Sequence, residues 1–435
     1  MTIRLGFFVS KFNTSYLILS NQVAKSITQF LLTIVLSRHI SPEIYGIYTL
    51  SLVYVVFLEI VRDFGFSNLA MQRKDVSPEE FNNNFWILAS RGALLSIAML
   101  FVISIYNQVF GFHSHETLRA NLMILAFVPF FAGVSAAYNI FIWRNERFKL
   151  ALGTDFISFF LAANIALFFL HFRFITVLLA FQLISYHIIL IFIRVRCTKA
   201  YPSFRPPRYI FRDLYNHPPF LGILNLIKAV TANFDSLLIG NLIGAQSLGL
   251  YNRAFQMSQV PIQQALESQT YLVLQRSRFN EKIRTVTEVH FKLSVPTIFL
   301  LTIFAFNSHE IVIFLYGPQW SKAAYPLGLL SIVAIIRVIE YKAYWFLLTL
   351  EQHKLLLKIN VLQQIVLVSG MSIGVIFGIQ GLCFGLVITS FFSFLVQLYI
   401  LRRRKVIESL SLFYKDIFVV SISCFINFIY LLIHK

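Results

Sequence analysis

Two ionisable residues in an otherwise apolar stretch raise the first chemical question. In "LIKAVTANFDSLLIGNLIG" (226–244), Lys228 and Asp235 have no charged neighbour between them. An ion at the centre of a bilayer costs on the order of 3 kcal/mol, so each needs a partner, a polar interior or water. On a helix at ~100° per residue, Asn225, Lys228 and Asp235 fall within an arc of about 80°. These polar groups therefore share one helical face.

Three further stretches carry a comparable polar stripe. The stripe between Arg253 and Glu267 is the clearest, because its members fall within about 100° on a helical wheel. A stripe of this kind cannot face lipid. It forms either a structural network between helices or the wall of a hydrophilic path, and four stripes together favour the path. The three stripes are Thr14, Asn21, Lys25 and Thr28 with Gln29 at the edge; Arg253, Gln256, Gln263, Gln264 and Glu267; and Arg337, Glu340, Tyr341 and Tyr344.

The elements that must position these residues are membrane helices. The chain has 435 residues, of which 57% are hydrophobic and 13% charged, whereas soluble domains are roughly half apolar and a quarter charged. Apolar runs long enough to cross about 30 Å of hydrocarbon as helix recur throughout. We predict an all-α, polytopic membrane protein with about thirteen transmembrane helices. The spans are 12–37, 44–63, 85–108, 118–142, 155–172, 174–195, 217–243, 248–273, 288–315, 323–349, 355–378, 380–401 and 411–433.

The basic residues predict the topology. The net charge is +18, but lysine and arginine gather in alternate connections, which argues against a nucleic-acid partner. Because such loops are cytoplasmic, we expect a cytoplasmic amino terminus, no cleaved signal peptide, an external carboxyl terminus and contact with anionic lipid headgroups. The basic connections are "QRKD", "WRNERFK", "RVRCTKAYPSFRPPRYIFRD", "QRSRFNEKIR", "EQHKLLLK" and "LRRRK".

An internal repeat predicts how the helices are grouped. An offset of 203 positions aligns 25–48 with 228–251, pairing Lys25 with Lys228 and Tyr48 with Tyr251. Since each half has an even number of spans, the repeat is parallel. We predict a six-helix lobe at 1–200, a second at 201–404 after a proline-rich linker, and an additional helix at 405–435. The two lobes enclose a central cavity.

Metal and cofactor chemistry has little support in the sequence. The three cysteines, Cys197, Cys383 and Cys424, lie far apart and match no metal-binding spacing. The "HSHE" at 113–116 is interpreted as a solvated loop. We expect no metal, no cofactor and no catalytic residue.

Four blocks resemble a known family. The chain resembles the polysaccharide-transport family of the multidrug, oligosaccharidyl-lipid and polysaccharide exporter superfamily, which comprises bacterial lipopolysaccharide and exopolysaccharide flippases. The resemblance covers nearly the whole chain. The blocks are "LSRHISPEIYGIYTL" (36–50), "VRDFGFSNLAMQRKDVSPEEFNNNFW" (61–86), "FDSLLIGNLIGAQSLGLYNRAFQMSQVP" (234–261) and "LYGPQWSKAAYPLGLLSI" (315–332).

The resemblance implies a function for the stripes. It implies two lobes in a V shape, alternating access, and a polyprenyl-pyrophosphate-linked oligosaccharide as substrate in the bacterial inner membrane, with polysaccharide assembly machinery as a further partner. Such a substrate needs fixed cations for its phosphates and amide donors for its sugars. The predicted cations are Lys25, Lys228, Arg253 and Arg337, and the predicted amides are Asn21, Asn225, Gln256, Gln263 and Gln264. Asp235, Glu267 and Glu340 are candidates for internal ion pairs or for ion coupling.

Three alternatives stay open. A multidrug or cation antiporter of the same superfamily would need the same lobes, although a cationic interior favours an anionic substrate. A polysaccharide polymerase or ligase would be expected to have a sizeable external loop, and the predicted external loops are short. A purely structural membrane scaffold would not need charged stripes in both halves.

Overall fold

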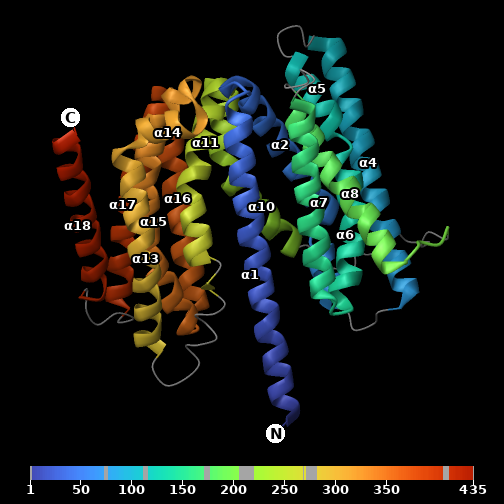
Figure 1. The fold of residues 1–435 in the computed structure, drawn as a ribbon, viewed down its shortest axis with the longest axis horizontal. Coiled ribbons are helices and arrows are strands. Elements are labelled where there is room, and N and C mark those ends of the chain that lie inside the picture. Colours follow the sequence, from blue (N-terminus) through green and yellow to red (C-terminus); the bar gives the residue numbers. More distant parts are fainter. Residues whose placement is uncertain are drawn as a thin grey trace. The chain divides into compact units, whose positions relative to one another are not determined.

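The computed structural model describes a helical protein (Figure 1). It covers residues 2–72, 77–110, 116–170, 177–204, 220–267, 269–270, 282–404 and 411–434. Every regular element in these ranges is helical. The chain divides into two compact units, Met1–Asn233 and Phe234–Lys435.

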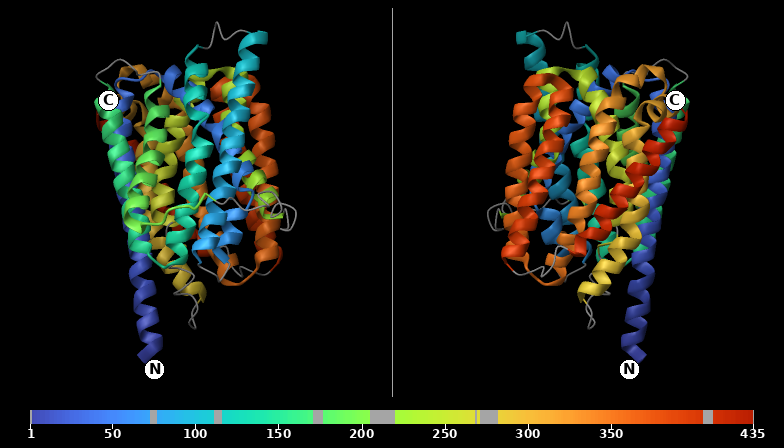
Figure 2. Two further views of the ribbon diagram at one scale, coloured as in Figure 1. Left: turned by 90° about the vertical axis from the view of Figure 1, so that its right-hand side faces the viewer. Right: turned by 90° about the vertical axis from the view of Figure 1, so that its left-hand side faces the viewer.

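The first unit is built from eight helices and the first part of a ninth. Helix α4 packs on α6, α7 on α8, and α1 on α7; in Figure 2 (left) these helices run lengthwise beside one another. The elements are α1 (Thr2–Ser37), α2 (Pro42–Asp63), α3 (Phe66–Gln72), α4 (Pro78–Phe110), α5 (Glu116–Leu125), α6 (Val128–Arg144), α7 (Phe148–Phe169), α8 (Leu178–Thr198) and α10 (Phe220–Leu238).

The second unit continues from α10 through a π-helical turn. Helix α13 packs on α15 and α18, and α16 packs on α17, as the right view of Figure 2 shows. Short 3-10 segments lie at Pro318–Ala323 and Val375–Phe377, and π-helical turns at Ile239–Ile243 and Gln263–Glu267. The helices are α11 (Ala245–Ile262), α13 (Lys282–Phe306), α14 (Ser308–Tyr316), α15 (Ala324–Thr349), α16 (His353–Gly374), α17 (Gly378–Arg403) and α18 (Ser411–His434).

A helical segment lies at each of the thirteen predicted spans. Within the described residues, nine stretches are long and apolar enough to cross a membrane, and the last of them, His353–Arg403, contains both α16 and α17. The nine account for all predicted spans except those of α1, α11 and α18. The prediction of an all-helical, polytopic membrane protein is confirmed.

The helix boundaries around the predicted repeat agree with its offset. Helix α2 begins at Pro42 and α11 begins at Ala245, which are the residues that the offset of 203 pairs. Ser41 caps α2, its hydroxyl accepting from the Ile44 amide at 3.4 Å. Gly244 precedes α11 with φ of +119°, a conformation that favours glycine. The division into lobes at 1–200, 201–404 and 405–435 stays a prediction, and most of the proline-rich linker lies outside the described residues.

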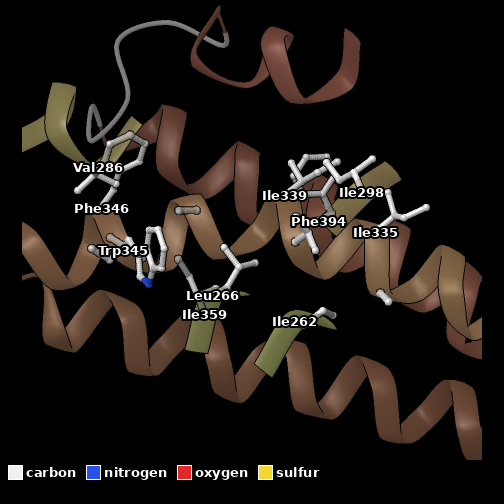
Figure 3. Close-up of a cluster of buried hydrophobic side chains, with 14 of the residues drawn as sticks. Ile262, Leu266, Val286, Ile298, Ile335, Ile339, Trp345, Phe346, Ile359 and Phe394 are labelled. Carbon is white, nitrogen blue, oxygen red and sulfur yellow. The ribbon is translucent and has the colours of Figure 1, made fainter. Parts of the chain in front are cut away.

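Each unit has its own interior. In the second unit, Leu266, Ile335, Trp345 and Phe346 belong to one buried cluster (Figure 3). In the first, α4 and α6 approach so closely that a Cβ at Gly133 would lie 2.5 Å from the Leu88 carbonyl oxygen. Small residues allow such contact, and lipid-embedded helices depend on close packing because lipid tails are as apolar as leucine.

Candidate functional site

A polar cavity lies inside the first unit. Its volume is about 350 Å³, and its walls come from α2, α6, α7 and α8. A cavity lined by ionisable groups between membrane-spanning helices is a functional-site candidate. The polar lining residues are Glu59, Arg62, Ser135, Asn139, Asp155, Tyr186, His187 and Arg194.

Lys25 is tied to one wall of this cavity. Its Nζ lies 2.8 Å from Asp155 Oδ2, while the Tyr186 hydroxyl donates to Asp155 Oδ1 at 2.5 Å. The same ammonium lies 5.4 Å from the Phe159 ring centroid and 5.7 Å from that of Tyr186. The Lys25 and Asp155 side chains keep 30% and 21% of their surface exposed, so the ion pair remains accessible to a polar ligand.

Arg194 is held firmly from three directions. It donates to Thr154 Oγ1 at 3.3 Å, to the Ser135 carbonyl at 3.1 Å and to Asn139 Oδ1 at 3.2 Å. It is 4% exposed. Arg194 lies inside the predicted span 174–195 and also begins the basic connection "RVRC", and the structure places it in α8, which continues to Thr198 and buries it.

Arg62 is a second buried cation. It is 7% exposed, and its Nη1 donates to the Pro129 carbonyl at 3.3 Å. Its Nε is buried and has no hydrogen-bond acceptor among the described residues. A buried donor without an acceptor is costly, so this guanidinium has capacity for an additional oxygen ligand.

A second cavity, of about 510 Å³, includes one of the predicted residues. Glu59 and Arg62 line both cavities, and here they are joined by Asp63 from α2 and by Asn225 and Asn233 from α10. Asn225 therefore lies beside ionisable groups, and its predicted role in binding sugars stays a prediction. The repeat partner of Lys25 cannot be placed in the same way, because the side chain of Lys228 lies outside the described residues.

Asp235 belongs to the second unit. It is 7% exposed and accepts from the Tyr251 hydroxyl at 2.7 Å and from the Ser236 amide at 2.7 Å. Its role in ion coupling or in an internal ion pair stays a prediction. Among the described residues, its hydrogen-bond partners are neutral donors, which the helical periodicity of the sequence did not indicate.

The other predicted residues of the second unit are dispersed. Arg253 is 2% exposed and lies 5.8 Å and 5.6 Å from the Tyr316 and Trp320 ring centroids. Its burial between aromatic rings favours an internal role. Arg337 donates to Gln259 Oε1 at 3.4 Å, and Glu340 accepts from Gln363 at 3.1 Å.

The remaining predicted amides vary in exposure. Gln256 is exposed and donates to Asn252 Oδ1 at 2.9 Å. Gln263 is exposed, whereas Asn21 and Gln264 are half-buried, and the side chain of Glu267 lies outside the described residues. The substrate-binding roles of all these residues stay predictions.

The sequence did not single out one buried ionic cluster. In the second unit, Lys342 of α15 forms an ion pair with Asp416 of α18, and the two side chains are 1% and 0% exposed. Ser294 donates to Asp416 Oδ1 at 3.2 Å, and His290 Nδ1 lies 3.6 Å from the same oxygen. Lys342 falls off the polar stripe of its helix and Asp416 is an isolated acid, so periodicity gave no signal for this pair.

No group of three or more potential metal ligands occurs within the described part of the chain. Most of the "HSHE" motif, 113–115, lies outside it.

Comparison with known proteins shows the family of this chain. The family model described as "Polysaccharide biosynthesis protein" matches residues 35–325, well over half of the chain. The chain belongs to this polysaccharide biosynthesis family. It is 26% identical over 296 residues to the teichuronic acid biosynthesis protein TuaB of Bacillus subtilis (strain 168), covering 65% of this chain and 60% of that protein. The chain thus matches about 60% of that relative's length.

Two solved structures show the fold of this family member. The lipid II flippase MurJ, in an inward closed conformation, matches with a TM-score of 0.66 and 15% identity over 95% of this chain and 93% of that chain. An inward-facing multidrug resistance transporter of the MATE family matches with a TM-score of 0.63 and 15% identity over 87% and 94%. The predicted superfamily fold is confirmed. The sequence resemblance to exporters is confirmed at the level of family.

Proposed function

We propose that this chain is a flippase that moves a polyprenyl-pyrophosphate-linked oligosaccharide across the bacterial cytoplasmic membrane for surface polysaccharide biosynthesis. The observation that carries the proposal is the pair of buried arginines, Arg62 and Arg194, beside a polar cavity within a member of the polysaccharide biosynthesis family. Guanidinium groups suit phosphate and carboxylate ligands because they form paired hydrogen bonds.

The polar groups of the first unit match the parts of such a substrate. The unpartnered Nε of Arg62 and the accessible ammonium of Lys25 offer cationic contacts. Asn139 and Asn225, which line the two cavities, offer amide groups for sugar hydroxyls. In the second unit, Arg337 and Gln256 are the proposed equivalents. Transport of a polar headgroup past lipid requires groups of both kinds, since polar atoms are costly to bury without partners.

Alternating access is the proposed mechanism. Two lobes, at 1–200 and 201–404, would expose the path to one side of the membrane at a time, and the helix at 405–435 would accompany the second lobe. The fold shared with MurJ and the MATE transporter supports the proposal, as does the agreement of helix starts with the predicted repeat. Membrane lipids and polysaccharide assembly proteins are the proposed partners.

Reconstituted protein tests the substrate class. In proteoliposomes, we expect faster movement of a lipid-linked oligosaccharide than of the same oligosaccharide without its lipid pyrophosphate. Arg62→Met should reduce the lipid-linked rate by about tenfold or more, because a hydrogen bond to a charged group contributes ~1.5–3 kcal/mol. Arg284→Ala is the matched control, since the Arg284 side chain is 71% exposed and pairs with Glu288 one turn away. Equal rates for the free and lipid-linked sugars would contradict the proposal.

One observation favours a second candidate. This candidate is cation antiport. The fold is similar to that of a multidrug resistance MATE transporter, and the polar cavity of the first unit is also lined by the carboxylates Glu59 and Asp155, which could bind a cation. Efflux of a hydrophobic cation that exceeds movement of the lipid-linked sugar would support this candidate. A polymerase or ligase activity is not proposed, because the structural neighbours given above are transporters.

A further inference from the structure

An apolar cavity lies beneath α18 in the second unit. It has a volume of about 530 Å³ and is enclosed by α13, α15, α17 and α18. Ile335, Ile339 and Phe394, labelled in Figure 3, form its buried floor. Phe391 and Ile417 on its rim are 55% and 45% exposed. The cavity therefore opens sideways, toward the lipid-facing surface of the helices.

Polar contacts hold α18 on both sides of this cavity. Asp416 binds Lys342 and Ser294 at one end, and Asn427 donates to Thr302 Oγ1 at 3.3 Å at the other. The two residues are about 16 Å apart along the helix. Between them, Ile417, Val420 and Cys424 line the cavity. The cavity therefore lies between the two polar contacts that attach α18 to the rest of the unit.

Such a space would be filled in a bilayer. Protein interiors are close-packed, and apolar side chains that face a void lose their dispersion contacts. The volume is within the ~300–1,000 Å³ range of ligand cavities, and nearly the whole lining is apolar. Hydrocarbon chains surround these helices in a membrane.

Four basic residues at the ends of α17 and α18 would favour a lipid with an anionic headgroup. Arg402 and Arg403 end α17, Arg404 is its C-cap residue, and Lys415 lies in the first turns of α18. All four side chains are exposed. Within the described residues, none of them forms a salt bridge with a carboxylate. Basic segments beside membrane helices bind the anionic headgroups of the cytoplasmic leaflet, and this connection is a predicted cytoplasmic one.

We propose that the second unit holds an anionic phospholipid of the cytoplasmic leaflet, with one acyl chain in the cavity beneath α18 and its phosphate at Lys415 and Arg402–Arg404. The geometry supports this arrangement. Lys415 and Cys424 are about 13 Å apart along α18, which a single acyl chain spans. The site is separate from the polar cavities of the first unit and takes a lipid that is not transported.

Lipid retention tests the site without any measurement of transport. The full chain is reconstituted in equal phosphatidylglycerol and phosphatidylcholine, repurified in mild detergent, and its bound lipids are quantified by mass spectrometry. We expect phosphatidylglycerol to be retained. The cavity-filling variant Ala305→Phe with Val420→Phe should retain at least ~tenfold less. Lys415→Gln with Arg403→Gln should lose the preference for phosphatidylglycerol over phosphatidylcholine, whereas the control Arg196→Gln, an exposed residue of α8, should keep it.

Three outcomes would overturn the proposal. These are equal retention by the cavity-filling variant, an unchanged headgroup preference in the charge variant, and recovery of a polyprenyl lipid in place of phospholipid. If the filled variant fails to fold, labelling of Cys424 with a lipid-soluble maleimide in a Cys197→Ser background replaces it, since Cys383 is buried. Labelling should then be slower in phosphatidylglycerol than in phosphatidylcholine, and equal rates would reject the site.

Discussion

Replacing Lys25 and its carboxylate partner separates a substrate-binding role from a structural one. If the Lys25 ammonium contacts the substrate pyrophosphate, Lys25→Ala removes a charged hydrogen bond that contributes ~1.5–3 kcal/mol. Because the side chain is 30% exposed, we expect the lower end of this range. That corresponds to about tenfold weaker binding.

The partner variant should behave differently. Asp155→Asn leaves the ammonium in place and removes an ion pair that is 2.8 Å long and partly exposed. Exposed pairs contribute ~0–1 kcal/mol, so export should remain within about fivefold of the unmodified protein. Lys25→Arg should retain part of the function. Lys25→Glu should be worse than Lys25→Ala, because it adds an anion close to Asp155 and to the substrate phosphate.

Export of surface polysaccharide in a flippase-deficient host measures these effects, with the membrane level of each variant checked by blot. Arg284→Ala breaks an exposed pair whose side chains are 71% and 57% accessible, and serves as the matched control. The reasoning would be refuted by recovery of export in the double variant Lys25→Ala with Asp155→Ala, which would show that Lys25 serves only to neutralise Asp155. Normal export by Lys25→Glu would refute it independently.

Three further predictions concern stability and topology. Asp416→Asn should lower the free energy of unfolding by ~3–5 kcal/mol, because it leaves the buried Lys342 ammonium without its anion. The double variant Lys342→Met with Asp416→Leu should recover most of this loss. Denaturant unfolding of the purified protein measures the free energy of unfolding of each variant. Gly133→Leu should abolish folded protein, because a Cβ at this position would lie 2.5 Å from the Leu88 carbonyl oxygen. The control Gly153→Ala should fold, since a Cβ there would have no atom within 4 Å. Size-exclusion chromatography distinguishes the two variants, and a monodisperse Gly133→Leu protein would contradict the packing argument. A topology reporter inserted after Arg404 should be active in the cytoplasm and one inserted after Gly317, between the predicted spans 288–315 and 323–349, should be active outside it. The opposite pattern would reverse the orientation.

The helices were predictable because their signal is local. A run of about twenty apolar residues must become helical in lipid, since every backbone polar group needs an internal partner. Most helix ends were predictable to within several residues, whereas α1 begins at Thr2, well before the predicted start at residue 12. Ser41 and Pro42 start α2 with a cap and a fixed φ.

The candidate site was predictable only in part. Polar periodicity identified Lys25 and Asn225, and both lie beside other polar groups of the first unit. It did not identify Arg62 or Arg194, because each sits near the end of an apolar run, where a cation is normally an interfacial anchor. Asp155 stands on a helix with no other acid in its apolar portion, so no stripe marked it.

The sequence by itself determined the class of protein, its helices, the predicted alternation of basic loops and its family, because each depends on composition or on residues close together in the chain. Tertiary structure decided which ions meet. Asp155 lies 130 residues from Lys25, and Asp416 lies 74 residues from Lys342. Helical periodicity gives the face on which a charge lies but not the neighbouring helix that packs against that face. Only packing brought these opposite charges within contact, and only packing left the apolar cavity beneath α18.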